Sequence, residues 1–345
     1  MNKLRKLFSI GFLIGMLAVF SIRTEHSSQG KSGLFGKTNE ENVFRLIASK
    51  LMTKENDFAL KSENNFISSA YAESLDIPAH SYVALDFATG EILEEKNSSK
   101  QISIASLTKI MTAVVALDLA SPDELFTYSD NALSQPATRL AFSPGDKLTL
   151  VELLNATLIA SANDCAEAIK EGIDSKYGGE VFVRAMNEKA KFLGLKSSHF
   201  DNPQGFDSRK NFSSAQDLAI LSHYALTHYP LIAQIVAMEY GELSPTAYHQ
   251  RYEYLNNWNG LLGVYPGVFG VKIGNTDDAG ATMIVGAERE NKKVLAVLLG
   301  APGVLERDLS AADLLDTGFA KLGLEKIGVT EVSLQEKYST WKYSN

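Results

Sequence analysis

The spacing of apolar residues changes along this chain, and that change constrains the fold more than any other feature of the sequence. Apolar residues recur with the helical period at 105–119, 148–160, 162–172, 179–193, 214–226 and 307–322. Shorter runs typical of strands lie at 82–85, 88–93, 268–272, 281–287 and 293–299. Strands therefore come first and last, with a helical block between them. This order predicts an α+β domain in which helices pack on an antiparallel sheet and a helical subdomain is inserted.

Charge and cysteine content exclude several classes of protein. The 33 basic and 41 acidic residues give a net charge of −8, which argues against a nucleic-acid binder because such a protein needs a basic face. Cys165 is the single cysteine, so an internal disulfide and a multi-cysteine metal site are both excluded. We expect Cys165 to be a buried apolar residue rather than a reactive thiol.

The N-terminus resembles an export signal. Three basic residues occur among the first six, and an uncharged apolar run follows at 7–22. Phe20 and Arg23 stand where a cleavage site needs small residues, so we favour an uncleaved signal-anchor at 1–22 over a cleaved signal peptide. Cleavage near Ala70-Tyr71-Ala72 stays open. Either reading places the body of the protein outside the cytoplasm, in the periplasm or cell envelope, tethered to the membrane or released.

Composition also predicts the domain boundaries. Residues 23–72 are polar and charge-rich and are expected to form a linker, within which a short helix is possible. A single domain is expected at 73–325. The remaining residues, 326–345, are too few for a second β-domain and are expected to form a tail.

Three short stretches could carry chemistry. Ser106 and Lys109 are three residues apart at the beginning of an expected helix, so they share one face, and a serine beside a buried lysine is a candidate nucleophile and base. Ser161-Ala162-Asn163 lies at a break between two helices, and Lys272-Ile273-Gly274 lies on an expected strand. Taken singly, each stretch has an ordinary structural explanation as a cap, a solvated charge or a close strand contact.

Together and in this order, the three stretches resemble the signature of penicillin-binding proteins and serine β-lactamases. Their flanks resemble the low-molecular-mass D-alanyl-D-alanine carboxypeptidases of the peptidase S11 type. The matching segments are 105–113, 161–164, 199–205, 265–268, 270–276 and 278–280. The resemblance covers roughly residues 75–325 and implies a β-lactamase/transpeptidase-like fold.

The resemblance implies a role for each catalytic candidate. Ser106 would attack the carbonyl of the penultimate D-alanine, and Lys109 would act as the base. Ser161 would pass a proton to the leaving D-alanine, and Asn163 would bind the substrate amide and orient Lys109. Lys272 would lie across the cleft and depress the pKa of Lys109 by its charge.

The same resemblance places the substrate-binding residues on the last strands. Lys272, Gly274, Asn275 and Thr276 would line the strand side, where the backbone N–H of Asn275 or Thr276 would complete an oxyanion hole with that of Ser106. Arg307 would help to hold the terminal carboxylate, although a solvent-exposed arginine on the helix surface is an equally good reading of this residue. We expect His199 to have no catalytic role and Asp164 to cap a helix.

One residue departs from the pattern. Ile273 occupies the position of a threonine or serine whose hydroxyl donates to the substrate carboxylate in the family. Losing a hydrogen bond to a charged group costs roughly 1.5–3 kcal/mol, which corresponds to about 10- to 150-fold in rate or affinity. The substitution weakens the expected site without removing its nucleophile.

These features predict a serine-type D-alanyl-D-alanine carboxypeptidase that acts on peptidoglycan stem peptides and is inhibited by β-lactam antibiotics. A D,D-endopeptidase that cleaves cross-links is an alternative with the same chemistry. A weakly active or non-catalytic peptidoglycan-binding relative is another, supported only by Ile273. A β-lactamase is disfavoured because the glutamate of Glu152-Leu153-Leu154-Asn155 precedes Ser161 instead of following it. No metal or organic cofactor is expected, since serine acylation needs none.

Overall fold

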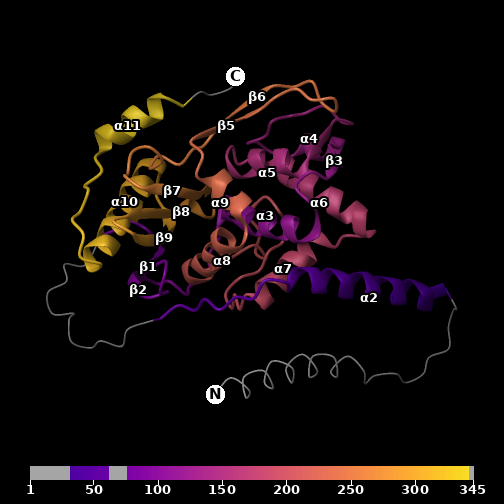
Figure 1. The fold of residues 1–345 in the computed structure, drawn as a ribbon, viewed down its shortest axis with the longest axis horizontal. Coiled ribbons are helices and arrows are strands. Elements are labelled where there is room, and N and C mark those ends of the chain that lie inside the picture. Colours follow the sequence, from indigo (N-terminus) through magenta and orange to yellow (C-terminus); the bar gives the residue numbers. More distant parts are fainter. Residues whose placement is uncertain (1–31, 62–75, 342–345) are drawn as a thin grey trace, which may run out of the picture. The chain divides into compact units, whose positions relative to one another are not determined.

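An antiparallel sheet of five strands joins the early and late parts of the chain (Figure 1). Its order is β2-β1-β9-β8-β7. The strands are β1 (Ser81–Asp86), β2 (Ile92–Lys96), β7 (Val268–Thr276), β8 (Gly280–Arg289) and β9 (Lys292–Ala301). β1 pairs with β9 from Ser81↔Leu299 to Asp86↔Val294, a contact between residues about two hundred positions apart. The strand predictions are confirmed, and β7 extends past the expected end at 272 to Thr276.

The structure, a computed structural model, describes residues 32–61 and 76–341. The expected signal-anchor at 1–22 lies outside these residues. None of the helices within the described ranges is long and apolar enough to cross a membrane. The chain divides after Val43 into two units. The first contributes residues 32–43 of helix α2 (Ser32–Leu51) to the described structure, and the second begins at Phe44.

A block of helices is inserted between β2 and β7, as the sequence predicts, together with two short ribbons that it does not predict. The short helix η1 (Ala105–Leu107) opens the block. It continues with α3 (Thr108–Leu119), α4 (Asp130–Ser134), α5 (Leu150–Leu158), α6 (Asn163–Tyr177), α7 (Phe182–Phe192), α8 (Ala215–His228) and α9 (Pro230–Val236). The ribbons are β3 (Leu125–Thr127) with β4 (Lys147–Thr149), and β5 (Tyr240–Leu243) with β6 (Glu253–Asn256).

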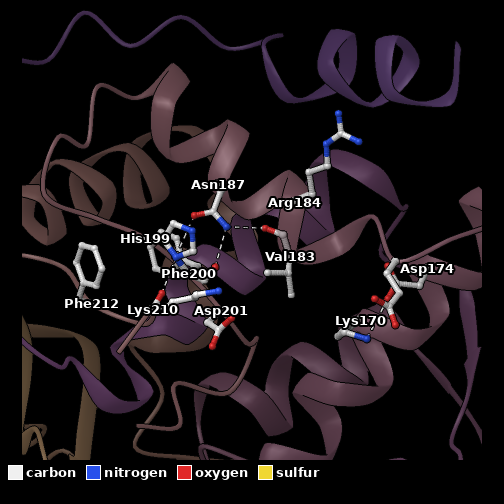
Figure 2. A pocket seen from close by; sticks show the side chains of 11 residues that line it. Lys170, Asp174, Val183, Arg184, Asn187, His199, Phe200, Asp201, Lys210 and Phe212 are labelled. Carbon is white, nitrogen blue, oxygen red and sulfur yellow. Dashed lines mark hydrogen bonds and ion pairs between the residues drawn. The ribbon is translucent and has the colours of Figure 1, made fainter. Parts of the chain in front are cut away.

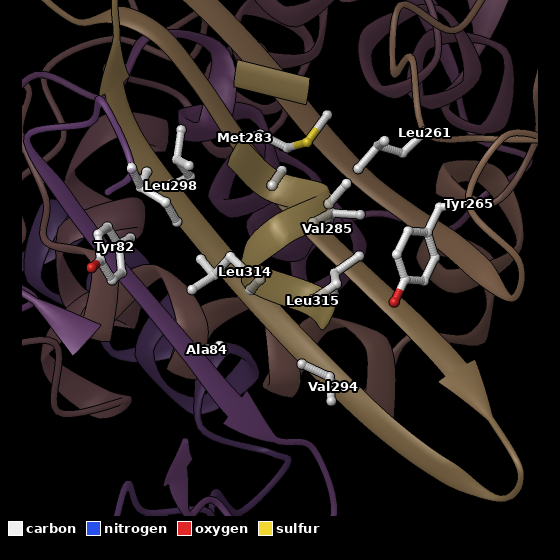
Figure 3. Packing of buried hydrophobic residues seen from close by; sticks show 14 of the residues in the cluster. Tyr82, Ala84, Leu261, Tyr265, Met283, Val285, Val294, Leu298, Leu314 and Leu315 are labelled. Atoms are coloured by element: carbon white, nitrogen blue, oxygen red, sulfur yellow. The ribbon is translucent and has the colours of Figure 1, made fainter. Parts of the chain in front are cut away.

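Helix α10 (Val304–Lys321) covers one face of the sheet and encloses the hydrophobic core shown in Figure 3. Leu314 and Leu315 of this helix pack with Met283, Val285 and Leu298 of the sheet. Successive residues of a strand point to opposite faces, so Ile284 and the intervening residues of β9 face the other way. On that second face the sheet contacts α8 and η1. The sheet therefore separates the α10 core from the helical block.

The predicted linker at 23–72 is wrong for residues 44–61. Ile47 and Leu51 of α2 are fully buried, and the backbone carbonyl of Leu51 accepts a hydrogen bond from Lys189 Nζ at 2.6 Å. Further along, the ring of Phe58 stacks on His223 with centroids 3.6 Å apart. Part of the apolar surface of this charge-rich segment is thus buried against the domain, which extends its boundary from residue 73 to Phe44, while Leu46 and Met52 stay exposed.

The predicted boundary at 325 is also wrong. Helix α11 (Glu331–Ser339) follows α10, and Leu334 is buried in the core beneath it. Tyr338 donates its hydroxyl hydrogen bond to Asp308 of α10 at 2.8 Å. Trp341 packs edge-on against Trp258, with ring centroids 5.2 Å apart. Residues 326–341 therefore belong to the folded unit, because their apolar and aromatic side chains complete its surface.

Candidate active site

The backbone around Ser106 is held by two glycines. Ser106 is the middle residue of η1, directly before α3, and its neighbour Ala105 has a positive φ of 49°. A Cβ on Gly205, whose own φ is 93°, would lie 1.9 Å from the carbonyl oxygen of Ala105. A Cβ on Gly274 of β7 would lie 2.9 Å from the backbone nitrogen of Ser106. Only glycine permits these approaches, so Ser106 is fixed between the 199–205 loop and β7.

Lys109 lies under Ser106 and has the environment of a general base. Its Nζ donates to Ser106 Oγ at 2.8 Å, as the i, i+3 spacing predicts. It also donates to Asn163 Oδ1 at 2.7 Å and to the backbone carbonyl of Gln204 at 2.8 Å. The side chain is 0% exposed. Burial, and secondly the charge of Lys272, hold the pKa of Lys109 well below its usual value. A neutral amine can then take the proton of Ser106.

Ser161 and Asn163 lie at the turn between α5 and α6, as expected. Ser161 has a positive φ of 61° and is buried. Asn163 is held on three sides: its backbone N–H donates to Thr138 O at 2.7 Å, its Nδ2 donates to Pro136 O at 3.1 Å, and its Oδ1 accepts from Lys109. The amide therefore has a fixed orientation that presents its oxygen to the lysine.

Asp164 is not the N-cap residue of α6, but its Oδ1 accepts a hydrogen bond from the backbone N–H of Cys165 in the first turn at 2.9 Å, so the capping expected from the sequence is present in part. The N-cap position belongs to Ala162, and Asp164 is fully buried. Its carboxylate accepts hydrogen bonds from Tyr128 Oη at 2.8 Å and from the backbone N–H groups of Leu140 and Ala141 at 2.9 Å each. It thereby fixes the loop that in turn holds Asn163. Burial of this aspartate has no signal in the sequence.

Lys272 and Arg307 form a positive end of the site. Lys272 is cross-strand paired with Ile284, so it faces the helical block that contains Lys109. It is 3% exposed, and its Nζ donates to the backbone carbonyl of Ile273 at 3.0 Å. Burial, together with the nearby Arg307 charge, lowers the pKa of Lys272 to about 7. Arg307 is 1% exposed, so it is not a residue of the helix surface.

Ile273 points to the opposite face from Lys272. It pairs directly with Met283 and packs against the α10 core. The sequence alone does not explain why isoleucine stands here, but this apolar contact does. Of the other substrate-binding candidates on β7, Asn275 is exposed. Thr276 uses its hydroxyl to donate to Asp207 at 2.7 Å, which ties the β7–β8 turn to the 199–207 loop.

Gln204 is a site residue that the sequence reasoning missed. It lies within the recognised 199–205 segment, but its contribution to Lys109 is a backbone carbonyl, which has no side-chain signal. Its side chain is anchored separately, because Nε2 donates to Glu167 Oε2 at 2.6 Å. The segment is further fixed by Thr112, whose hydroxyl donates to Pro203 O at 2.7 Å.

His199 lies apart from the reacting groups, whereas Cys165 is close enough to Lys109 for the two side chains to interact electrostatically. His199 lines a separate cavity of about 660 Å³ between α6, α7 and the 199–212 segment, and its Nδ1 lies 2.5 Å from Lys210 O (Figure 2). Cys165 is fully buried, which raises its pKa well above the usual value and makes it unreactive. Within the described ranges, no cluster of three or more His, Cys, Asp or Glu side chains could hold a metal ion.

Comparisons with known proteins agree with this arrangement. Residues 67–303 match the Peptidase S11 family, D-alanyl-D-alanine carboxypeptidase. The chain is 35% identical over 249 residues to D-alanyl-D-alanine carboxypeptidase DacF of Bacillus subtilis, covering 70% of this chain and 62% of the relative. It is 32% identical over 263 residues to D-alanyl-D-alanine carboxypeptidase DacD of Escherichia coli, covering 70% of this chain and 63% of the relative. The chain therefore spans less than two thirds of the length of these relatives.

Solved structures show the same fold. The Streptomyces K15 DD-transpeptidase is 28% identical, with a TM-score of 0.66 over 71% of this chain and 98% of that one. Penicillin-binding protein D2 of Listeria monocytogenes, solved with ampicillin bound, is 29% identical. Its TM-score is 0.61 over 72% of this chain and 100% of that one. These matches confirm the predicted β-lactamase/transpeptidase-like fold. The chain belongs to the peptidase S11 family, the D-alanyl-D-alanine carboxypeptidases.

Proposed function

We propose that this protein is a serine-type D-alanyl-D-alanine carboxypeptidase that removes the terminal D-alanine of peptidoglycan stem peptides and is acylated by β-lactams. The observation that carries the proposal is the contact between Ser106 Oγ and the fully buried Nζ of Lys109, at 2.8 Å. Family membership and the names of the relatives support the substrate class. The ampicillin-bound Listeria relative supports β-lactam binding.

Acylation begins with proton transfer from Ser106 Oγ to the neutral Nζ of Lys109. The oxygen attacks the carbonyl carbon of the penultimate D-alanine and forms a tetrahedral oxyanion. In this proposal the backbone N–H groups of Ser106 and Asn275 stabilise that oxyanion, since Gly274 brings β7 against η1. The C–N bond then breaks, and the proton held by Lys109 passes through Ser161 to the leaving amine of D-alanine. Water attacks the resulting ester and gives its proton to Lys109, which returns it to Ser106 Oγ as the ester bond breaks. The peptide leaves with a single D-alanine at its C-terminus.

The free carboxylate of the substrate is the feature that the positive end of the site recognises. Lys272 and Arg307 are buried cations whose charges interact, and Asp308 balances only one of the two, so the site favours a second anion. A terminal carboxylate supplies that anion. The isoleucine at position 273 leaves carboxylate recognition more dependent on these two charges than in relatives with a hydroxyl there.

The envelope location is part of the same proposal. The basic residues and apolar run of 1–22 support export, with the enzyme outside the cytoplasmic membrane, either tethered by this segment or released after cleavage. Stem peptides of the cell wall lie in the same compartment, so the substrate and the proposed location agree.

The experiment is acylation of the full chain by benzylpenicillin, followed by intact-mass measurement, with Ser106→Ala as the control. A stable adduct that is lost in the control supports the proposal, and release of D-alanine from a peptide ending in D-alanyl-D-alanine completes the test. If no adduct forms and the drug stays intact, the protein is a non-catalytic relative. If the drug is consumed without an adduct, it is a β-lactamase.

A further inference from the structure

Arg307 is held by a hydrogen-bonded chain that leads to the C-terminal helix. Its Nε donates to Asp308 Oδ1 at 2.7 Å, and both side chains are buried. The other carboxylate oxygen, Asp308 Oδ2, accepts from Tyr338 Oη of α11 at 2.8 Å. Arg307 Nη2 also donates to the backbone carbonyl of Trp258 at 3.3 Å. The guanidinium is therefore bonded directly to the backbone at Trp258 and, through Asp308, linked to α11.

The pairing of Arg307 with Asp308 is unusual for a helix. Residues i and i+1 of a helix point in directions about 100° apart, so they do not ordinarily face each other. Something outside α10 must hold the carboxylate in place. Gly260 does so from one side, since a Cβ there would lie 2.2 Å from Asp308 Oδ2. Tyr338 does so from the other side, and its ring is fixed by Trp341 at a centroid distance of 4.6 Å.

The position of Arg307 matters because its charge reaches Lys272. The guanidinium contributes to lowering the pKa of Lys272, so the two cations share one electrostatic environment. Ile273 faces the α10 side of β7, and it has no hydroxyl to help hold an anion there. A shift of the guanidinium would therefore change carboxylate binding without touching Ser106 or Lys109.

We propose that Asp308 and Tyr338 are positioning residues that hold Arg307 for recognition of the substrate's terminal carboxylate, so that α11 is part of the specificity apparatus. This inference rests on the proposed carboxypeptidase activity. In this proposal α11 does more than cover the core. The hydroxyl of Tyr338, rather than its ring, influences which substrates bind, because it holds Asp308 and through it Arg307.

The test compares two tyrosines that make the same contact in different places. Tyr338 and Tyr265 each donate to an aspartate of α10, to Asp308 at 2.8 Å and to Asp316 at 2.7 Å. Only Asp308 is bonded to Arg307. Tyr338→Phe and Tyr265→Phe are therefore matched losses of one hydroxyl. Each full-length variant is assayed with a peptide ending in D-alanyl-D-alanine and with the same peptide as its C-terminal carboxamide.

Tyr338→Phe is expected to raise KM for the free-acid peptide by about 3- to 10-fold, the range for losing one hydrogen bond, with kcat nearly unchanged. The slower turnover of the carboxamide should stay within about twofold, because that substrate has no carboxylate to lose. Tyr265→Phe should alter neither substrate's KM, although both variants lower the melting temperature.

The inference is overturned if Tyr338→Phe behaves like Tyr265→Phe, or if it slows both peptides equally. Asp308→Asn provides a second test, because it keeps the side-chain shape but removes the charge paired with Arg307. Asp308→Asn should raise KM for the free-acid peptide by more than Tyr338→Phe does, and it should leave turnover of the carboxamide nearly unchanged. If the parent protein releases no D-alanine at all, the proposed function fails. If the parent is active but Tyr338→Phe and Tyr265→Phe give the same KM, only the positioning role fails.

Discussion

Two lysines of this protein are equally buried but differ in the charge state that their surroundings favour. Lys109 and Lys189 are both 0% exposed. Lys189 of α7 forms an ion pair with Asp118 at 2.8 Å and donates to Tyr224 Oη at 2.9 Å and to Leu51 O at 2.6 Å. Lys109 has a hydroxyl, an amide oxygen and a carbonyl as its described hydrogen-bond acceptors, and none of these is a carboxylate.

The difference lies in how each site treats a positive charge. Burial lowers the pKa of both lysines, but at Lys189 the charge of Asp118 opposes burial, whereas at Lys109 the charge of Lys272 adds to it. Lys189 is thus stabilised as a cation that holds structure together, and Lys109 is prepared to be neutral and to accept a proton. Burial alone does not make a lysine catalytic; the sign of the strongest charge that acts on it does.

Replacing Lys109 with methionine should have the largest effect. We expect acylation by benzylpenicillin to fall about 10²- to 10⁴-fold, because the general base is lost, while the free energy of unfolding falls little or rises. Stopped-flow acylation and urea denaturation measure the two quantities. A variant that acylates within tenfold of the parent would show that another group deprotonates Ser106.

Lys189→Met should give the reverse pattern. Removing it leaves Asp118 buried without its partner, which costs about 3–5 kcal/mol of stability, while the acylation rate per folded molecule stays unchanged. Urea denaturation provides the measurement. In the double variant Lys189→Met/Asp118→Leu most of the loss should be recovered, because no lone charge remains. Failure of that recovery would mean that the ion pair is not what the single variant disrupts.

Ile273→Thr extends the comparison to the strand that carries the third buried lysine, Lys272. Residue 273 faces the α10 side of β7, the side of Arg307, so we expect the hydroxyl to add a donor for the substrate carboxylate from that side. The gain in kcat/KM for a free-acid peptide should be about tenfold, the lower end for a hydrogen bond to a charged group. Ile273→Val is the control, because it has the same branching without a hydroxyl and should give no gain. An equal gain in both variants would point to relief of crowding rather than to hydrogen bonding.

The pH profile should show the smallest but most specific effect. Lys109 must be neutral, so kcat/KM rises with pH as this residue loses its proton. Lys272 must be charged, and with a pKa of about 7 it loses its charge above neutrality, so kcat/KM falls there by up to about tenfold per pH unit. Lys272→Arg should move the falling limb to higher pH, since guanidinium stays protonated. Lys189→Met should leave the pH profile of kcat/KM unchanged. A shift of either limb in this variant would show that the charge of Lys189 influences the titration of Lys109 or Lys272.

The sequence predicts the parts of the site that depend on local spacing. Ser106 and Lys109 at i, i+3 meet as expected, and the order of the three motifs identifies the fold before any coordinates are seen. Spacing could not predict Gln204, because its contact is a backbone carbonyl. Nor could it predict that Lys189 is buried as completely as Lys109, since only tertiary contacts reveal its partners Asp118, Tyr224 and Leu51.

The errors in the domain boundaries have a common physical cause. Residues 44–61 and 326–341 are short, charge-rich segments with few apolar side chains, which composition assigns to linkers and tails. Some of these apolar residues, such as Leu51 and Leu334, are nevertheless fully buried because the domain supplies the other side of each contact. The spacing of apolar residues within such a segment cannot predict its burial, because the surface that buries them is formed by residues elsewhere in the chain.

The docking of Leu51 on Lys189 has a practical consequence for anyone preparing this protein. A fragment cut at the start of β1 would retain every candidate catalytic residue, yet it would strip the cover from Lys189 and Asp118 and expose the apolar sites filled by Ile47 and Leu51. Such a fragment would be prone to aggregate, and its poor behaviour could be mistaken for an inactive enzyme. Expression of this protein should therefore keep the residues from Phe44 onward.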